Sequence, residues 1–211
     1  MTPRNVFSLA AALTVALSMN AAAQTTVLAP TASSKITVAG GSNVHEWSCS
    51  GSKFDAAIEM DATSLIKPLG EVSKPIMKVV VNIPTKSVKC GKDKMDENMW
   101  KALKAEQFPT IKYELTGYKL DAAKTTATSF VALTEGNLTV AGTTAKVSIP
   151  VTASRKEGGQ FVGVGTLDML MTDVGIKPPT ALLGTMRTKN EIKISFEVLL
   201  DKSVVVALTQ Q

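Results

Sequence analysis

The sequence predicts an all-β domain with a single α-helix, and three observations lead to this prediction. Apolar and polar residues alternate with a two-residue period along most of the chain, as in strands that bury one face. Glycine and proline residues separate these runs at short intervals, as turns do. Only residues 94–107 carry apolar side chains at helical spacing. So many amphipathic strands must stack as two sheets or close into a barrel, because a single open sheet would leave its apolar face in water.

The first 23 residues have the features of a cleaved signal peptide. Arg4 provides a positive start, residues 6–19 are apolar but too short to span a bilayer, and small alanines precede the expected cleavage after Ala23. We therefore expect export to an oxidising compartment. Residues 24–33 would form a linker, residues 34–200 the folded domain and residues 201–211 a C-terminal tail.

The strand pattern is clearest in residues 53–60 and 191–200. In both segments apolar residues alternate with charged or other polar ones, so each strand would have one buried and one wet face. Shorter runs with the same alternation bring the expected total to about eight to ten strands. These runs are residues 36–38, 77–83, 111–115, 138–140, 147–151 and 167–171. A barrel of about eight strands has an interior that is either filled by side chains or holds one slim ligand.

Residues 94–107 are predicted to form the one helix. Met95, Met99 and Leu103 recur every four residues and would share one face. Pro109 disfavours the helical conformation in the residue before it, which places the end of the helix at about residue 107. The apolar face would either close the end of a solid core or cover a ligand cavity.

Cys49 and Cys90 are the only cysteines, and export makes them a candidate disulfide. In the chain-entropy model, a bridge that closes a loop of this length would contribute roughly 4 kcal/mol. Two free buried thiols are the alternative. A metal site is not expected, because His45 is the only histidine and no CxxC motif is present.

The sequence contains no catalytic motif that we recognise. GxSxG, HExxH, a phosphate-binding loop and a dinucleotide glycine fingerprint are all absent. His45 and Glu46 are adjacent, and neighbours along a strand point to opposite faces, which argues against a catalytic dyad. Asp168 and Asp173 fit a structural role better, since Asp173 begins a turn. We therefore expect a protein that is not an enzyme and needs no cofactor.

The formal net charge of +5 comes largely from lysines that are scattered along the chain. There is no basic run interleaved with aromatic residues, so nucleic-acid binding is not expected. Transient contact with an anionic membrane surface is compatible with this charge.

Four stretches of the sequence together resemble the YceI-like family. In chain order they are GGSNVHEWSCSG, IPTKSVKCGKDKMDENMWKALKAEQFPTIKYEL, GNLTVAGTTAKVSIPV and LDMLMTDVGIKPPTALLGTMRTKNEIKISFEVLL. The resemblance implies a lipocalin-like antiparallel β-barrel of about eight strands, located in the periplasm. It also implies that the apolar interior holds a polyisoprenoid, a quinone or a similar amphipathic chain, for transport or storage. No catalytic residues follow from it, and the cysteine pair is not treated as a family feature.

Under this hypothesis the inward-facing residues form the wall of a ligand site. The candidates for the wall are Phe54, Ile58, Val79, Val81, Tyr113, Leu115, Val147, Ile149, Leu167, Met169, Ile194 and Phe196. His45 and Trp47 would lie at the rim, and Met99 and Leu103 would contact the ligand from the covering helix. The competing hypothesis is a filled-core module that docks a periplasmic partner and binds no small molecule. In either case we expect a monomer or a homodimer.

Overall fold

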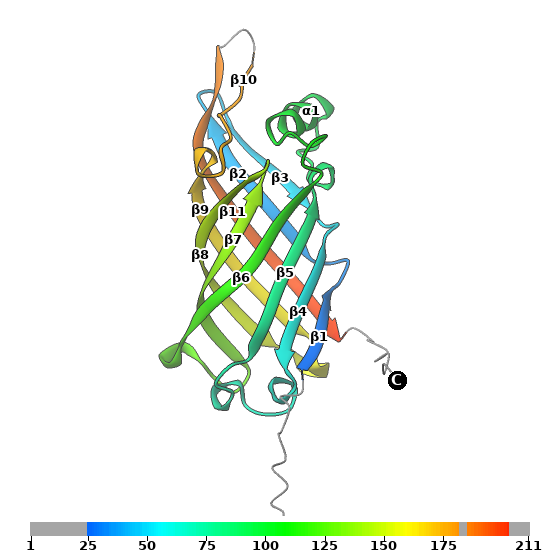
Figure 1. The fold of residues 1–211 in the computed structure, drawn as a ribbon, viewed down its shortest axis with the longest axis vertical. Helices are drawn as coiled ribbons and strands as arrows, with labels where there is room; N and C mark the ends of the chain where they lie inside the picture. The colour runs from blue at the N-terminus through cyan, green and yellow to red at the C-terminus, as the bar shows by residue number, and fades with distance from the viewer. Residues whose placement is uncertain (1–24, 182–184, 203–211) are drawn as a thin grey trace, which may run out of the picture.

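The computed structural model describes residues 25–181 and 185–202, which form a β-barrel with one α-helix at the end drawn uppermost in Figure 1. We call this end the upper end. The strands are β1 (Thr25–Pro30), β2 (Lys35–Ser42), β3 (Glu46–Gly51), β4 (Asp55–Asp61), β5 (Ile76–Pro84), β6 (Thr110–Asp121), β7 (Ser129–Val140), β8 (Thr143–Arg155), β9 (Phe161–Leu170), β10 (Thr180–Ala181) and β11 (Met186–Lys202). None of the helices among these residues is long and apolar enough to cross a membrane.

Eight of these strands close the barrel. They follow the order β1-β4-β5-β6-β7-β8-β9-β11, and β1 pairs with both β4 and β11, so the two ends of the sheet meet. The pairings along this path are antiparallel. Closure leaves no open edge along this part of the sheet. The structure thus confirms the predicted all-β barrel with one covering helix.

Strand β1 lies in the segment that we expected to be a linker. Leu28 pairs with Ile58 of β4 and with Lys202 of β11, and its side chain is completely buried. The barrel therefore begins before residue 34, and β11 extends past the expected start of the tail. The threonines and alanines around this short strand obscured it, and its partner β11 lies at the other end of the sequence. Residues 1–23, the expected signal peptide, fall outside the described residues, as do residues 203–211.

The upper end of the barrel is built differently from the lower end. Strand β2 continues the course of β1 along β11, and β3 pairs with β2. On its other side, β3 makes a single described bridge, between Ser50 and Lys89. The helix α1 (Asp93–Ala102) and the segments that flank it cover this side in place of a further strand (Figure 1).

The helix α1 ends five residues before the predicted end. Lys104 adopts a left-handed backbone conformation with φ of 50°, which an α-helix cannot continue. The N–H groups of Lys104 and Ala105 donate to the carbonyls of Lys101 and Trp100 at 3.0 and 2.9 Å. This is the hydrogen-bond pattern of a Schellman motif, so the helix stops well before Pro109.

The lower half of the barrel is solid. Leu28 and Phe130 are 0% exposed and Phe161 is 1% exposed, and the three pack in one cluster. The loop between β4 and β5 seals this end with the fully buried Leu69. Arg155 holds this loop in place, because its guanidinium donates to the backbone carbonyls of Ser64 and Lys67 in the loop at 2.8 Å. Apolar side chains therefore fill most of this half.

Candidate functional site

The upper half of the barrel encloses a cavity of about 440 Å³. This volume lies in the range of small-molecule sites. Inward-facing aliphatic residues from six strands form much of its wall. They are Ile36 and Val38 of β2, Ile83 of β5, Ile111 of β6, Leu138 and Val140 of β7, Met169 of β9, and Ile192 and Ile194 of β11.

Five of the nine methionines line this cavity. They are Met95, Met99, Met169, Met171 and Met186. Methionine side chains are unbranched and polarisable, so a wall rich in them can adapt to the shape of a flexible apolar molecule.

The helix α1 forms the roof of the cavity. Met95, Met99 and Ala102 line it from the helix, and Leu103 does so from the residue that follows. These residues share one helix face, as the four-residue spacing predicted. Of the two interpretations left open by the sequence, the helix covers a cavity and does not close a solid core.

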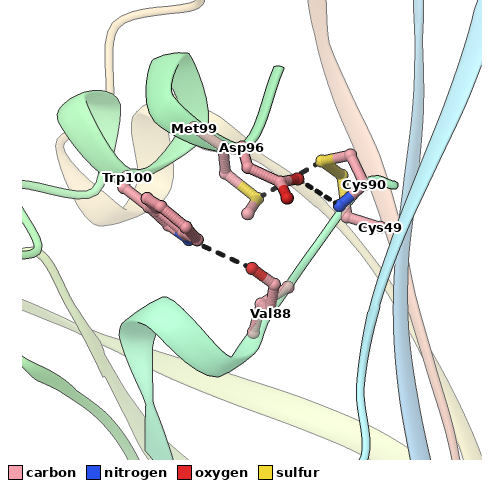
Figure 2. Close-up of a disulfide and its surroundings, with 6 residues drawn as sticks. All are labelled: Cys49, Val88, Cys90, Asp96, Met99 and Trp100. Atoms are coloured by element: carbon pink, nitrogen blue, oxygen red, sulfur yellow. Dashed lines mark hydrogen bonds between the residues drawn. A yellow bond between two sulfur atoms is a disulfide. The ribbon is translucent and has the colours of Figure 1, made fainter. Parts of the chain in front are cut away.

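The disulfide between Cys49 and Cys90 ties this roof to the barrel (Figure 2). Cys49 belongs to β3 and Cys90 to the segment that leads into α1. The backbone N–H of Cys90 donates to the buried carboxylate of Asp96 at 2.5 Å, and the sulfur atoms of Cys90 and Met99 lie 3.7 Å apart. The predicted disulfide is therefore confirmed, and it forms part of the cavity wall.

A second contact in Figure 2 holds the other side of the helix. The indole N–H of Trp100 donates to the carbonyl of Val88 at 3.1 Å. Val88 is buried and also lines the cavity. The hydrogen bonds that α1 makes in Figure 2 thus go to the strand-like segment before it, and that segment joins β3 through the Ser50–Lys89 bridge and the disulfide.

Trp47 and His45 both line the cavity, and they lie near its rim. The ring of Trp47 occupies the space that a side chain at Gly40 on the neighbouring strand would need, and its N–H donates to the carbonyl of Gly41 at 3.1 Å. His45 is exposed in the turn between β2 and β3.

The charged residues of the cavity wall are all basic. Lys92 and Lys94 line it from the start of α1, and no aspartate or glutamate does so among the described residues. Both lysines are exposed, so they mark the mouth. The ammonium group of Lys94 also lies 3.1 Å from the carboxylate of Glu97, whereas Lys92 has no ion pair in the described chain.

A layer of larger side chains lies below the cavity-lining residues, halfway down the barrel. The ring of Tyr113 occupies the space beside Gly136, and the ring of Phe196 occupies the space beside Gly165. Burial raises the pKa of Tyr113, and a hydrogen bond with the Thr134 side chain only partly offsets this effect. The phenol is therefore uncharged at neutral pH, and the layer presents a largely apolar surface.

Six of the sixteen predicted ligand-contacting residues line the cavity. They are His45, Trp47, Met99, Leu103, Met169 and Ile194. Tyr113, Val147, Ile149, Leu167 and Phe196 belong to or pack against the core cluster around the cavity, but they do not line it.

The remaining five predicted residues do not form the cavity wall. Ile58, Val79 and Leu115 pack against the solid lower core. Phe54 and Val81 are half-buried and belong to neither core cluster. Their alternation predicted the correct type of strand, but a two-residue period gives the face of a strand and not its depth in the barrel.

Sequence reasoning missed the cavity residues at the upper ends of the strands. Ile83 and Ile111 are examples, since each lies directly before or after the segment that contains α1. A useful signal was available, because strand residues closest in sequence to a covering helix must lie at the covered end. The same argument applies to Leu138 and Val140, which end the strand paired with β6.

The arrangement is suited to binding an apolar molecule. Within residues 25–181 and 185–202, no group of three His, Cys, Asp or Glu side chains is placed to hold a metal ion. The site instead combines an enclosed apolar space with a mouth that carries lysine and histidine.

Comparison with known proteins gives one family and several related structures. The family model of the YceI-like domain matches residues 24–200. No curated protein matches the sequence. BcnA of Burkholderia cenocepacia is 16% identical, with a TM-score of 0.63 over 80% of this chain and 96% of that one.

Two further structures share the barrel. A polyisoprenoid-binding domain from Saccharophagus degradans is 11% identical, with a TM-score of 0.63 over 85% of this chain and 100% of that one. The YCEI protein of Campylobacter jejuni is 18% identical, with a TM-score of 0.51 over 72% of this chain and 82% of that one. At these identities the structural likeness shows the fold alone.

Proposed function

This chain belongs to the YceI-like family, and we propose that it is a lipid-binding protein whose cavity holds the apolar chain of a polyisoprenoid, a quinone or a similar amphipathic molecule. The cavity of about 440 Å³ under α1 is the observation that carries the proposal. The name of the Saccharophagus degradans structure, a polyisoprenoid-binding domain, adds support. The alternative of a filled-core module has less support, because the upper half of the barrel is hollow.

The physical basis of binding would be removal of an apolar chain from water. Each Å² of apolar surface that enters the cavity contributes roughly 25 cal/mol. Much of the cost of organising a site is avoided, because the β-ladders and the disulfide hold the wall in place. The polar head of the ligand would stay at the mouth, beside Lys92, Lys94 and His45.

We further propose that the protein acts as a carrier or a store in the periplasm, and that it has no enzymatic activity. The signal-peptide features of residues 1–23 support export. A carrier must collect its ligand from a membrane, and the mouth has features that suit brief contact with an anionic surface. Val44 is 64% exposed in the turn next to His45, and Lys92 and Lys94 supply positive charge.

Two adjacent substitutions on β11 test the proposal. Ile192→Trp places a large side chain in the cavity, whereas Lys193→Trp adds the same side chain on the outer face. We expect Ile192→Trp to abolish binding of farnesol and of a short-chain quinone, and Lys193→Trp to bind both as the wild type does. Isothermal titration calorimetry would measure the affinities, and circular dichroism would confirm that both variants fold.

Mass spectrometry of organic extracts from natively purified protein would identify what the cavity carries. We expect an amphipathic molecule with a long apolar chain. Protein that is reproducibly empty, and that binds no isoprenoid alcohol, quinone or fatty acid in solution, would refute the proposed function.

A further inference from the structure

We propose that Tyr113, Leu167 and Phe196, which pack in the layer below the cavity-lining residues, form a floor that limits the length of the chain the cavity accepts. This inference rests on the proposed function and adds a length limit to it. A chain of up to about three isoprene units would bind fully enclosed, and the rest of a longer chain would remain outside the mouth. We call these three residues the floor.

The order of residues down the strands places the floor. On β6, Ile111 lines the cavity, Tyr113 comes next on the inner face, and Leu115 packs against the solid lower core. The same sequence of layers occurs on β11. There Ile194 lines the cavity, and Phe196 follows it on the inner face.

The next residue of β11 and one further strand, β9, agree with this order. On β11, Val198 lies below Phe196 and packs against the lower core. On β9, Met169 lines the cavity, Leu167 lies directly below it, and Phe161 at the far end of the strand belongs to the lower core. The neighbouring strands β9 and β11, and β6 elsewhere in the barrel, therefore each change from cavity wall to solid core along their inner faces.

Glycines beside the aromatic rings let each ring extend sideways over the neighbouring strand. Gly136 on β7 and Gly165 on β9 have no side chain, and the rings of Tyr113 and Phe196 fill the spaces where a side chain would be. Each ring can then lie against the neighbouring strand instead of pointing straight across. Thr134, the next inner-face residue of β7 below Gly136, is buried, and its hydroxyl donates to the carbonyl of Ile149 at 2.9 Å.

One small space remains below the floor. A side chain at Gly163 would meet no other atom within 4 Å, and Gly163 lies on the same face of β9 as Gly165 and Leu167. It pairs with Val198 of β11, directly beneath Phe196. Removal of the Phe196 ring would therefore open space between Ile194, which lines the cavity, and this gap, whereas Phe130 and Phe161 fill the lower core beyond it.

The volume of the cavity sets the expected limit. A methylene group takes up about as much room as a water molecule, roughly 30 Å³ in a liquid, so about 440 Å³ holds on the order of 15 carbon atoms, or about three isoprene units. Affinity should rise with chain length up to this limit and then level off, because further units stay in water.

A series of isoprenoid alcohols with the same head group tests the limit in the intact protein. Geraniol, farnesol, geranylgeraniol and solanesol would be compared through quenching of tryptophan fluorescence, since Trp47 lines the cavity. For the wild type we expect at least a roughly tenfold gain from geraniol to farnesol, from the added buried methylenes, and less than about threefold from farnesol onward.

Three variants should move the limit in opposite directions. Phe196→Ala and Leu167→Ala lower the floor, so geranylgeraniol should gain about tenfold over farnesol. Ile194→Phe raises the floor, so farnesol should lose its advantage over geraniol. Val198→Ala is the matched control, because it also removes buried carbon atoms but lies below the floor. It should leave the affinity ratios unchanged.

The outcomes separate this inference from the proposed function. If affinity continues to rise from farnesol to solanesol in the wild type, or if the ratios do not move in any folded floor variant, the floor is overturned and lipid binding stands. If no alcohol of any length binds, the proposed function itself fails. Should Phe196→Ala not fold, Leu167→Ala and Ile194→Phe still decide the question, with folding checked by circular dichroism.

Discussion

The upper and lower halves of this barrel share the strands β6, β7, β9 and β11, yet one half is hollow and the other is solid. The difference lies on the side where the barrel closes. In the lower half, β1 pairs with β4 and β11, and β4 pairs with β5, so ladders run all the way round. In the upper half, β3 has a ladder on one side only, and α1 covers the other.

A helix in place of a strand explains the hollow half in simple geometric terms. Paired strands lie about 4.8 Å apart. A helix with its side chains is about 10 Å across, so it cannot take the place of a strand at that spacing. It holds its side of the wall further out, and the side chains that fill the lower half do not reach across. The cavity is thus a consequence of how the barrel is closed.

The largest expected effect comes from a matched pair of leucine substitutions, one in each half. Leu28→Ala removes a side chain that is 0% exposed in the solid half, and we expect a loss of about 4 kcal/mol in the free energy of unfolding. Leu138→Ala removes the same atoms from the cavity wall. Fewer contacts are lost there, so the expected loss is about 2 kcal/mol.

Urea unfolding of the two variants, followed by circular dichroism, would measure this difference. A similar loss in both variants would show that the upper half is packed as tightly as the lower half, contrary to the comparison. Leu28→Ala also tests whether β1 belongs to the barrel, since a residue in an unstructured linker would cost almost nothing when truncated.

Removal of the disulfide should have the next largest effect and should act mainly on the upper half. For Cys49→Ala with Cys90→Ala we expect a loss of about 2–4 kcal/mol in the free energy of unfolding, because the bridge closes a loop across 41 residues. Native-state hydrogen exchange should show faster exchange in α1 than in the wild type, since the helix loses its covalent link to β3.

Strands of the lower half serve as the internal control for that experiment. Backbone amides of β7 near Phe130 should remain among the most slowly exchanging amides of the variant, as in the wild type. Equal acceleration in both halves would mean that the disulfide stabilises the barrel as a whole and does not hold the roof in particular.

The sequence identified the kinds of elements well, because periodicity reports local structure. Alternation predicted the strands, and the spacing of Met95, Met99 and Leu103 predicted the face of α1 that covers the cavity. The expectation of export and the two cysteines predicted the disulfide, which the structure contains. The fold class followed from these local patterns together with the resemblance to a family.

What the sequence could not give is position along the barrel axis. Leu115 and Ile194 are both inward-facing residues of amphipathic strands, yet one packs in the solid half and the other lines the cavity. Their depth depends on the register between strands and on where the barrel closes. That closure involves Leu28 and Lys202, whose pairing joins the first and last strands of the barrel. A pairing between residues so far apart in the sequence cannot be recognised from a local sequence pattern.

The smallest expected effect is on ligand affinity and comes from the charged residues at the mouth of the cavity. Lys92→Gln with Lys94→Gln should weaken binding of a fatty acid about two- to fivefold at low salt, because the lysines are exposed and each contributes little. Binding of the fatty alcohol with the same chain should not change, because its head group is neutral. Lys193→Gln on the outer face is the matched control. An equal loss for acid and alcohol in the mouth variant would mean that the lysines act through the packing of α1, and the head group would then not be recognised by charge.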